Sequence, residues 1–406
     1  MSNIAKDRRS KVLQGDTFRI AQEAKTAKQE NDRVIDVTVG ALFDDDGSFH
    51  TFRSITGAIQ RIEDHRNYAY PPIDGGKPFR ESLMSWVFQD HEQWIKETFS
   101  VDLIATPGAC GALHNAFLNY MEPEDRLIMP DIYWTNYRAI LANIDRTYRT
   151  YPMFEQNRFD LVALKRTVEQ EIKGHDRIIL LFNDPAHNPT GYSLSHSEWQ
   201  EVHRYASELI ESGKRVTIVY DLAYMDYAGD TLEASREIFQ TIADVHEDLV
   251  MLFAFSGSKS FSIYGQRLGA LIAVSKNPYE IDAFSRAARF LARSTWSCPP
   301  ATGLRLIEDL PLIKDDFIAE LKRARETLKA RSEIFIQEAA EVGLEHYPYR
   351  SGFFVTLTSE DPADSYERLS EQGIYGIPVE RGLRLSLSSL SLRDVKGLAK
   401  RIKNIL

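Results

Sequence analysis

The chain has 406 residues, of which 43% are hydrophobic and 27% charged, and its formal net charge is −10. This length favours two domains, or one large domain with a smaller one, and the composition argues against disordered, collagen-like and coiled-coil proteins. The acidic balance disfavours a general binder of nucleic acid or of anionic membranes, because both need a positive field.

The cysteine content and the apolar segments indicate the cellular compartment of the protein. Cys110 and Cys298 are the two cysteines, too few for a disulfide framework or a cysteine-based zinc site, and they suit a reducing cytosol. The first residues lack the apolar segment of a secretion signal, and no apolar run approaches the ~20 residues of a membrane span. We therefore expect a cytoplasmic protein with no membrane, nucleic-acid or metal partner.

Short apolar segments alternate with longer segments of helical spacing through the middle of the chain. The apolar segments are mostly continuous, which is typical of strands buried on both faces. They are DLIATPG (102–108), RLIMPD (126–131), RIILLFND (177–184), RVTIVYD (215–221), LVMLFAFS (249–256) and GALIAVS (269–275). Helical spacing marks residues 111–121, 160–172 and 195–213. This alternation predicts an α/β domain around a largely parallel sheet, over residues 46–302.

The pattern changes after residue 302. Residues 315–343 have the spacing of a long helix, and the segments 352–359 and 383–390 predict short strands. We expect a second, smaller α+β domain over residues 303–406, with residues 1–45 forming an N-terminal arm and part of that small domain.

Unusual residues follow the carboxyl ends of five predicted strands. Open α/β sheets bind their ligands at that edge. The residues are the glycine-rich turn at 108–111, Tyr133 with Trp134, Asn188, Asp221 and Lys259. We expect these segments to converge on one crevice.

Lys259 is the most informative of these residues. A lysine at the end of a buried strand is partly desolvated, which lowers its pKa and makes the neutral amine available to form a Schiff base. A lone lysine would more often extend to solvent. Its neighbours favour the chemical interpretation, because Ser256, Ser258 and Arg267 could join a glycine-rich helix start in binding a phosphate. The P-loop motif is absent around this lysine.

Asp221 closes a strand, where burial would raise its pKa unless a cation or a donor pairs with it. Helix capping or a structural salt bridge would also explain an acid at this place. Tyr224 follows three residues later. The carboxylate and the phenol could therefore address two edges of one aromatic ring.

Together these motifs resemble the class I aminotransferases of pyridoxal-phosphate fold type I. SGSK, YGQRLG, HNPTG (187–191) and YDLAY (220–224) carry the likeness, and the segments VTVGALFDDDG, YAYPPIDG, TPGACGAL, YWTNY, WSCPP and GLRLSLSSL extend it along nearly the whole chain. The aspartate and aromatic-amino-acid aminotransferases are the most similar subfamily. The resemblance implies a large domain with a mostly parallel seven-stranded sheet flanked by helices, and a smaller α+β domain.

The resemblance implies pyridoxal 5′-phosphate (PLP) as the cofactor and gives roles to many residues. Lys259 would bind PLP covalently and move the proton of the substrate α-carbon. Asp221 would pair with the pyridinium nitrogen, and Tyr224 and Asn188 would hydrogen-bond the ring's phenolic oxygen. Further cofactor-binding residues would be Trp134, stacked on the ring, Gly108, Ala109, Cys110, Ser256, Ser258 and Arg267 around the phosphate, and Tyr70 from a second subunit.

Two arginines would bind the substrate. Arg384 matches the residue that binds the α-carboxylate through a bidentate pair. Arg293 matches an arginine that, in this subfamily, reaches from the other subunit to the distal carboxylate of the substrate. Gly40, Asn188 and Trp134 complete the implied substrate site. The resemblance thus implies a homodimer with shared active sites that acts on amino acids and 2-oxo acids.

Some positions depart from the subfamily. Ala109 and Cys110 replace a glycine and a hydroxyl residue of the phosphate loop, and Cys298 replaces the asparagine of SNPP. A thiol is a weak donor, so we expect Cys110 to offer mainly its backbone N–H. Tyr137 and Asn183 stand where the aspartate enzymes have histidines near the ring.

The implied activity moves the amino group of an L-amino acid, aspartate or an aromatic one, to 2-oxoglutarate by a ping-pong mechanism through pyridoxamine phosphate. A PLP-dependent lyase or decarboxylase on the same fold would use the same lysine, although Arg293 favours dicarboxylates and transamination. A non-catalytic, ligand-sensing module is an alternative from another class.

Overall fold

The computed structural model describes residues 2–9, 11–12 and 17–406. Its centre is a seven-stranded sheet in the order β2-β10-β9-β8-β7-β3-β4. The strands are β2 (Ser100–Pro107), β3 (Arg126–Pro130), β4 (Thr147–Tyr151), β7 (Arg177–Phe182), β8 (Arg215–Asp221), β9 (Val250–Phe255) and β10 (Leu268–Ser275). Neighbouring strands of this sheet run parallel, except that β10 is antiparallel to both β9 and β2. The predicted mostly parallel sheet is confirmed.

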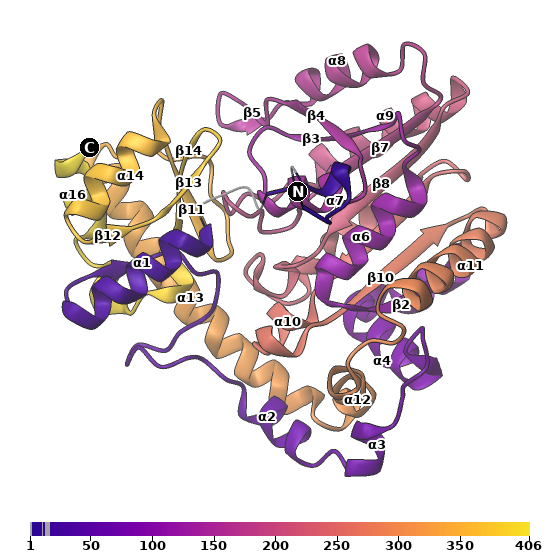
Figure 1. Cartoon of the computed structure of the whole chain (residues 1–406), viewed down its shortest axis with the longest axis horizontal. Helices are drawn as coiled ribbons and strands as arrows, with labels where there is room; N and C mark the ends of the chain where they lie inside the picture. The colour runs from indigo at the N-terminus through magenta and orange to yellow at the C-terminus, as the bar shows by residue number, and fades with distance from the viewer. Residues whose placement is uncertain (1, 10, 13–16) are drawn as a thin grey trace.

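Helices cover both faces of this sheet (Figure 1). Successive residues of β9 point to opposite sides: Phe253 belongs to one core cluster with Trp199, and Leu252 to another with Phe117. The helices of this part are α2 (Arg53–Gln60), α3 (Asp64–Tyr68), α4 (Gly76–Phe88), α5 (Glu92–Thr98), α6 (Gly108–Tyr120), α7 (Asn136–Asn143), α8 (Leu161–Glu171), α9 (His196–Glu211), α10 (Gly257–Ser260), α11 (Pro278–Thr295) and α12 (Ala301–Asp309). The continuous apolar sequences of the strands follow from this two-sided burial.

Two of the predicted helices start at residues whose side chains satisfy free backbone donors. The Asp160 side chain accepts the Ala163 N–H at the start of α8. Ser195 and Glu198 form a reciprocal capping box at the start of α9. The helical segments expected at 111–121, 160–172 and 195–213 correspond to α6, α8 and α9 and are confirmed.

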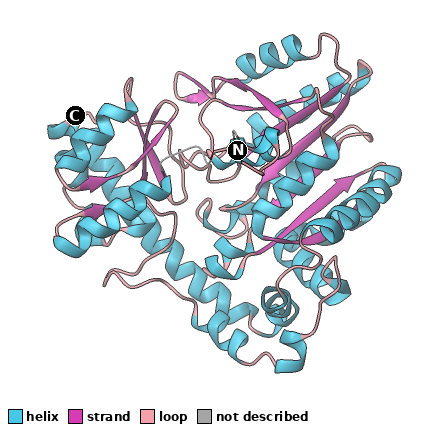
Figure 2. Cartoon of the chain, in the orientation of Figure 1, coloured by secondary structure: helices cyan, strands magenta, loops and turns pink. Residues whose placement is uncertain are grey.

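A second, smaller group of strands lies apart from the central sheet (Figure 2). The antiparallel sheet β11-β14-β13 is accompanied by the parallel pair β1-β12, which brings the N-terminal segment into this group. The elements are α1 (Thr17–Glu30), β1 (Ile35–Asp36), β11 (Phe354–Thr358), α14 (Pro362–Glu371), β12 (Ile374–Tyr375), β13 (Ile377–Val379), β14 (Gly382–Ser386), α15 (Leu392–Val395) and α16 (Leu398–Ile405). A short hairpin, β5 (Phe154–Glu155) with β6 (Arg158–Phe159), lies near β4.

The long helix α13 (Lys314–Val342) connects the two parts. Its Phe317 and Leu321 belong to the core cluster that contains Phe253 of the central sheet. Its Phe335 and Ala339 belong to the core of the small part. The domain limits at 45/46 and 302/303 stay predictions, and Met1, Ser10 and residues 13–16 of the predicted arm lie outside the described residues. In the described part of the chain, no helix has the length and apolar character needed to cross a bilayer.

Candidate active site

Most of the predicted site residues meet at one edge of the central sheet. β2, β7, β8 and β9 all end at this edge, because β2 and β9 are both antiparallel to β10. Gly108, Asp221 and Lys259 are carried by the ends of these strands or by the turns that follow. Arg267 directly precedes β10, which runs the other way, so it reaches the same edge. We call this place the sheet-edge crevice.

The start of α6 lies beside the guanidinium of Arg267. Gly108 opens the helix with a φ of +71°, and a Cβ there would lie 2.3 Å from Nη2 of Arg267. Only glycine allows the guanidinium to approach the helix start this closely. Pro107 precedes the helix and has no side-chain group to cap it, so the first N–H groups, including those of Ala109 and Cys110, are available to an anion.

Two serines near Lys259 form hydrogen bonds around Arg267 and the start of α10. Ser258 is buried, donates to the carbonyl of Leu268, and accepts a hydrogen bond from Nη1 of Arg267 at 3.3 Å. Ser256 is also buried, and its carbonyl accepts the backbone N–H of Lys259. The two serines therefore fix the guanidinium and the short helix α10.

The Lys259 amine points into the sheet-edge crevice. Its Nζ donates to the carbonyl of Gly40 at 3.0 Å and lies 4.8 Å and 5.5 Å from the ring centroids of Tyr264 and Tyr224. Burial, followed by the nearby Arg384 and Arg267 charges, lowers the pKa of Lys259 to about 8. This direction agrees with the expectation from its place at the end of a buried strand.

Gly40 is needed where the N-terminal segment crosses the crevice. A Cβ at this position would lie 2.5 Å from Cζ of Phe354 and 3.3 Å from the hydroxyl of Tyr224. Its carbonyl is the acceptor for Lys259. Glycine here lets the small part of the protein lie against the sheet edge.

Asp221 is buried at the end of β8. Its Oδ2 accepts a hydrogen bond from the Tyr137 hydroxyl at 2.6 Å, and its Oδ1 accepts the N–H of Ala223 at 3.1 Å. Burial raises the pKa of Asp221 to about 6, although the Tyr137 hydrogen bond acts in the opposite direction. Asp221 therefore has the donor partner that its position required.

Arg384 brings the small part of the protein into the site. From β14 it donates to Oδ1 of Asn188 at 3.2 Å and to the carbonyl of Thr38 at 2.6 Å. Its Nε is buried and has no hydrogen-bond partner in the described part of the chain. Burial lowers the pKa of Arg384 to about 10, and the nearby Tyr224 opposes this shift. A buried guanidinium with an unused donor fits an anionic group of a substrate.

Trp134 and Tyr224 provide aromatic surface in the same region. Trp134 is half-buried and meets Tyr137 edge to face, with ring centroids 5.3 Å apart. Tyr224 is buried against Phe353 and Phe354. Burial raises the pKa of Tyr224, so its hydroxyl keeps its proton.

The charge of the crevice is suited to anions. The described residues there include three cationic groups, Lys259, Arg267 and Arg384, together with the carboxylate of Asp221, and the two arginines help to lower the pKa of Lys259. Burial raises the pKa of the half-buried Cys110, which keeps its thiol neutral. A phosphate and a carboxylate would balance this excess of positive charge.

Tyr70 and Arg293 are not in the crevice of their own chain. The Tyr70 side chain is 93% exposed, and the exposed Arg293 donates to Ser297 Oγ at 2.5 Å near the end of α11. Neither contacts Lys259, Asp221 or Arg384 among the described residues. This placement is consistent with the expectation that both act in a second subunit, which stays a prediction.

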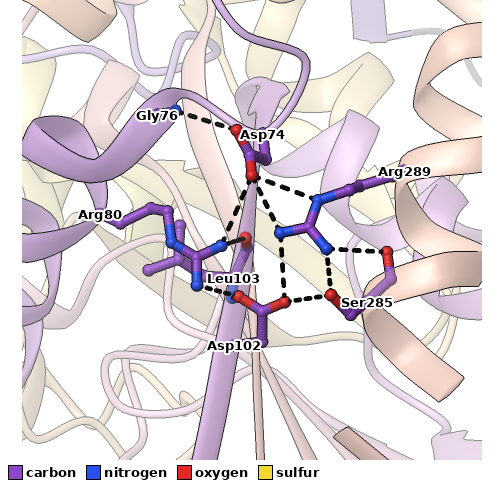
Figure 3. Close-up of polar contacts among 7 residues, drawn as sticks. All are labelled: Asp74, Gly76, Arg80, Asp102, Leu103, Ser285 and Arg289. Atoms are coloured by element: carbon purple, nitrogen blue, oxygen red, sulfur yellow. Dashed lines mark hydrogen bonds and ion pairs between the residues drawn. The ribbon is translucent and has the colours of Figure 1, made fainter. Parts of the chain in front are cut away.

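A network of ion pairs connects the segments that carry these two residues. Figure 3 shows Arg80 and Arg289 lying between Asp74 and Asp102, with Ser285 donating to Asp102. Arg289 Nη2 lies 2.9 Å from Asp74 Oδ2 and 3.5 Å from Asp102 Oδ2. Asp74 lies in the loop that carries Tyr70, and Arg289 lies one helical turn before Arg293. The network therefore joins the segments that carry the two exposed residues to β2.

Sequence reasoning did not assign roles to three contacts of the site. Tyr264 lies over the Lys259 amine and accepts the N–H of Leu42. Thr38 offers its carbonyl to Arg384, and the phenol of Tyr137 donates to Asp221. Tyr264 opens the YGQRLG segment that also carries Arg267, so its place in the sequence could have indicated that it lies near the site. The other two contacts join segments far apart in the chain.

Comparisons with known proteins identify the family of this chain. The family model for "Aminotransferase class I and II" matches residues 32–402. The chain belongs to this family. As a class I and II aminotransferase, it is a PLP-dependent transaminase, and the alternative of a non-catalytic module is set aside.

Relatives of this aminotransferase cover most of its length. It is 27% identical to the aromatic-amino-acid aminotransferase of Paracoccus denitrificans, over 91% of this chain and 92% of that protein. It is 25% identical to the mitochondrial aspartate aminotransferase of Arabidopsis thaliana, over 91% of this chain and 85% of that protein. The similarity thus extends over both parts of the fold.

Solved structures share the fold of this aminotransferase. An aminotransferase from Anaerococcus prevotii superposes with a TM-score of 0.95 at 30% identity, over 100% of this chain and 99% of that one. The aromatic-amino-acid aminotransferase of Burkholderia pseudomallei, a structure covalently bound to pyridoxal phosphate, superposes with a TM-score of 0.83 at 23% identity, with 100% of both chains covered.

Proposed function

We propose that this aminotransferase moves the amino group of an L-amino acid, either aspartate or an aromatic one, to 2-oxoglutarate in two half-reactions of a ping-pong cycle. One observation carries the proposal. Lys259, Asp221 and Arg384, from three distant segments, converge on the sheet-edge crevice beside the uncapped start of α6.

The residues of the crevice fit PLP. The α6 start and Arg267 would hold the phosphate, where a Cβ on Gly108 would displace the guanidinium. Asp221 would face the pyridine nitrogen as an anion. Tyr224 and Asn188 would hydrogen-bond the ring's phenolic oxygen, and Trp134 would cover one ring face.

Lys259 would carry the covalent link and the proton transfer. When bound, PLP supplies an electron sink that stabilises negative charge on the substrate α-carbon. With a pKa of about 8, about one Lys259 in ten is neutral at pH 7, against about one in several thousand for an ordinary lysine. The neutral amine is the form that reacts and accepts a proton.

Arg384 would bind the α-carboxylate of the substrate. Its buried Nε has a free donor, while Asn188 and Thr38 hold the other nitrogens in place. A guanidinium fixed in this way gives a carboxylate a planar, bidentate partner. Arg384 would thereby orient every amino-acid or 2-oxo-acid substrate in the same way.

Arg293 would select substrates with a second carboxylate from the position of a partner subunit. Tyr70, Phe290 and Arg293 are exposed on connected segments of one chain, and Phe290 is a large apolar side chain 77% exposed next to Arg289. An apolar side chain at such a place favours burial by another chain. We propose a cytoplasmic homodimer in which each subunit lends Tyr70 and Arg293 to the other.

A panel of amino donors with 2-oxoglutarate tests the reaction. We expect aspartate, phenylalanine or tyrosine to yield glutamate in equal amount to the new 2-oxo acid, and Lys259→Ala to yield none. Consumption of the donor without glutamate would instead indicate a lyase or a decarboxylase. Absence of any turnover with all donors would contradict the proposed activity.

A mixed dimer tests the sharing of sites. Lys259→Ala and Arg293→Ala chains are purified separately, mixed under conditions that exchange subunits, and assayed with aspartate. If Arg293 acts in the partner, the hybrid contains one complete site and aspartate activity appears on mixing. If Arg293 acts within its own chain, mixing restores nothing.

A further inference from the structure

The hydroxyl of Tyr137 joins helix α7 to the buried carboxylate of Asp221. The Tyr137 hydroxyl donates to Asp221 Oδ2 at 2.6 Å, and both side chains are at most 2% exposed. An O–H···O⁻ distance of this size is typical of a charge-assisted hydrogen bond, about twice as strong as a neutral one. Such a bond favours the ionised form of the carboxylate.

The packing around Tyr137 directs its hydroxyl toward Asp221. It occupies the first turn of α7, and Trp134 packs edge to face against its ring. Burial and the Asp221 charge raise the pKa of Tyr137 well above its usual range. The phenol therefore keeps its proton and acts as a donor at every pH at which the enzyme would work.

The groups around Asp221 do not replace this donor. Besides Tyr137, its carboxylate oxygens receive the backbone N–H of Ala223. The titratable groups that face it are Lys259 from α10, Cys110 from α6 and Tyr224 after β8. Burial raises the pKa of Asp221, and among its neighbours the Tyr137 hydrogen bond opposes that rise most strongly.

We propose that Tyr137 is a positioning residue, whose hydroxyl keeps Asp221 ionised and holds its carboxylate in the orientation that pairs with the pyridine nitrogen of PLP. The proposal rests on the role of Asp221 in the proposed function. Tyr137 acts through Asp221. Its effect should therefore be visible in cofactor binding before any substrate is added.

The test measures the PLP dissociation constant from pH 5 to pH 8.5 for wild type, Tyr137→Phe and Tyr133→Phe. For wild type we expect affinity to fall as the pH drops through about 6, where Asp221 takes up a proton. Loss of the hydroxyl should move this midpoint upward by about one pH unit or more. Tyr133→Phe removes a hydroxyl that contacts Tyr148 instead, so it should leave the midpoint in place.

A double-mutant cycle separates an effect through Asp221 from a general loss of packing. In an Asp221→Asn background, Tyr137→Phe should change PLP affinity by less than about twofold, because no carboxylate remains to be held. A similar loss in both backgrounds, or an unchanged midpoint in Tyr137→Phe alone, would overturn the proposal. If Asp221→Asn by itself left PLP affinity unchanged, the role of Asp221 in the proposed function would fail instead.

A second variant covers the case in which Tyr137→Phe does not fold. Tyr137→His keeps an N–H donor at this position. We therefore expect the pH at which its PLP affinity falls to stay near the wild-type midpoint and below pH 7. A Tyr137→His midpoint above pH 7, with native PLP stoichiometry, would contradict a role for the hydrogen bond.

Discussion

Arg384→Lys is the substitution that tests substrate orientation most sharply. It keeps the positive charge but replaces a planar group of three nitrogens by one. The single amine of lysine would have to serve Asn188, Thr38 and the substrate carboxylate, which Arg384 can address from separate nitrogens. At least one hydrogen bond to a charged group is lost, which costs about 1.5–3 kcal/mol, and a buried acceptor left without its donor costs about 1–3 kcal/mol more.

These values sum to about 2.5–6 kcal/mol. The lower part of this range, about 3 kcal/mol, corresponds to a loss of about 150-fold in kcat/KM, since each 1.4 kcal/mol is a factor of about ten. The assay is steady-state kinetics with the best donor of the panel, together with the PLP dissociation constant, which should stay within about twofold of wild type. Arg381→Lys is the matched control, because Arg381 is exposed and pairs with Asp131, and neither residue forms a hydrogen bond with Lys259, Asp221 or Arg384 in the described part of the chain. A loss below about fivefold, or an equal loss of PLP affinity, would refute the reasoning.

Three further substitutions or conditions follow from the same geometry. Gly108→Ala should weaken PLP binding at least tenfold, because its Cβ would meet Arg267 at 2.3 Å and its φ of +71° costs about 1–2 kcal/mol for alanine; equilibrium dialysis showing wild-type affinity would contradict this. Covalent capture of PLP by Lys259, followed by stopped-flow absorbance, should accelerate as the pH rises through about 8, where the amine loses its proton; a rate that is flat from pH 7 to pH 9 would count against the lowered pKa. Arg289→Ala should lower the free energy of unfolding by about 1–2 kcal/mol in urea titrations, whereas Arg286→Ala, which removes an exposed pair on the same helix, should cost less than about 0.5 kcal/mol; equal losses would show that the network adds nothing.

Much of the sheet and of its functional edge could be predicted from the sequence. Strands buried on both faces leave a continuous apolar pattern, so a polar residue such as Asp221 at the end of one stands out. Lys259 and Gly108 were recognisable in the same way, because each follows a strand whose limits are visible. The reversed direction of β10 left no such signal, since an apolar segment has the same pattern in either direction.

Contacts between distant segments were not predictable from local patterns. Tyr137 reaches Asp221 from a helix that follows β3, and its hydroxyl looks like any core tyrosine until the helix is placed. Arg384 donates to the carbonyl of Thr38, which lies 346 residues earlier in the sequence. For Arg293 the family resemblance gave a role, whereas within the described residues of one chain its side chain donates to Ser297. Long-range packing decides the first two contacts, and the proposed subunit association would decide those of Arg293.

Reduction of the PLP-loaded enzyme with borohydride, followed by peptide mapping, tests the central claim most directly. This treatment fixes covalently bound cofactor on the amine that carries it. The structure predicts one phosphopyridoxyl group per chain, on Lys259, and none in Lys259→Ala. Label on a different lysine, or unlabelled Lys259 in a fully loaded enzyme, would contradict the account.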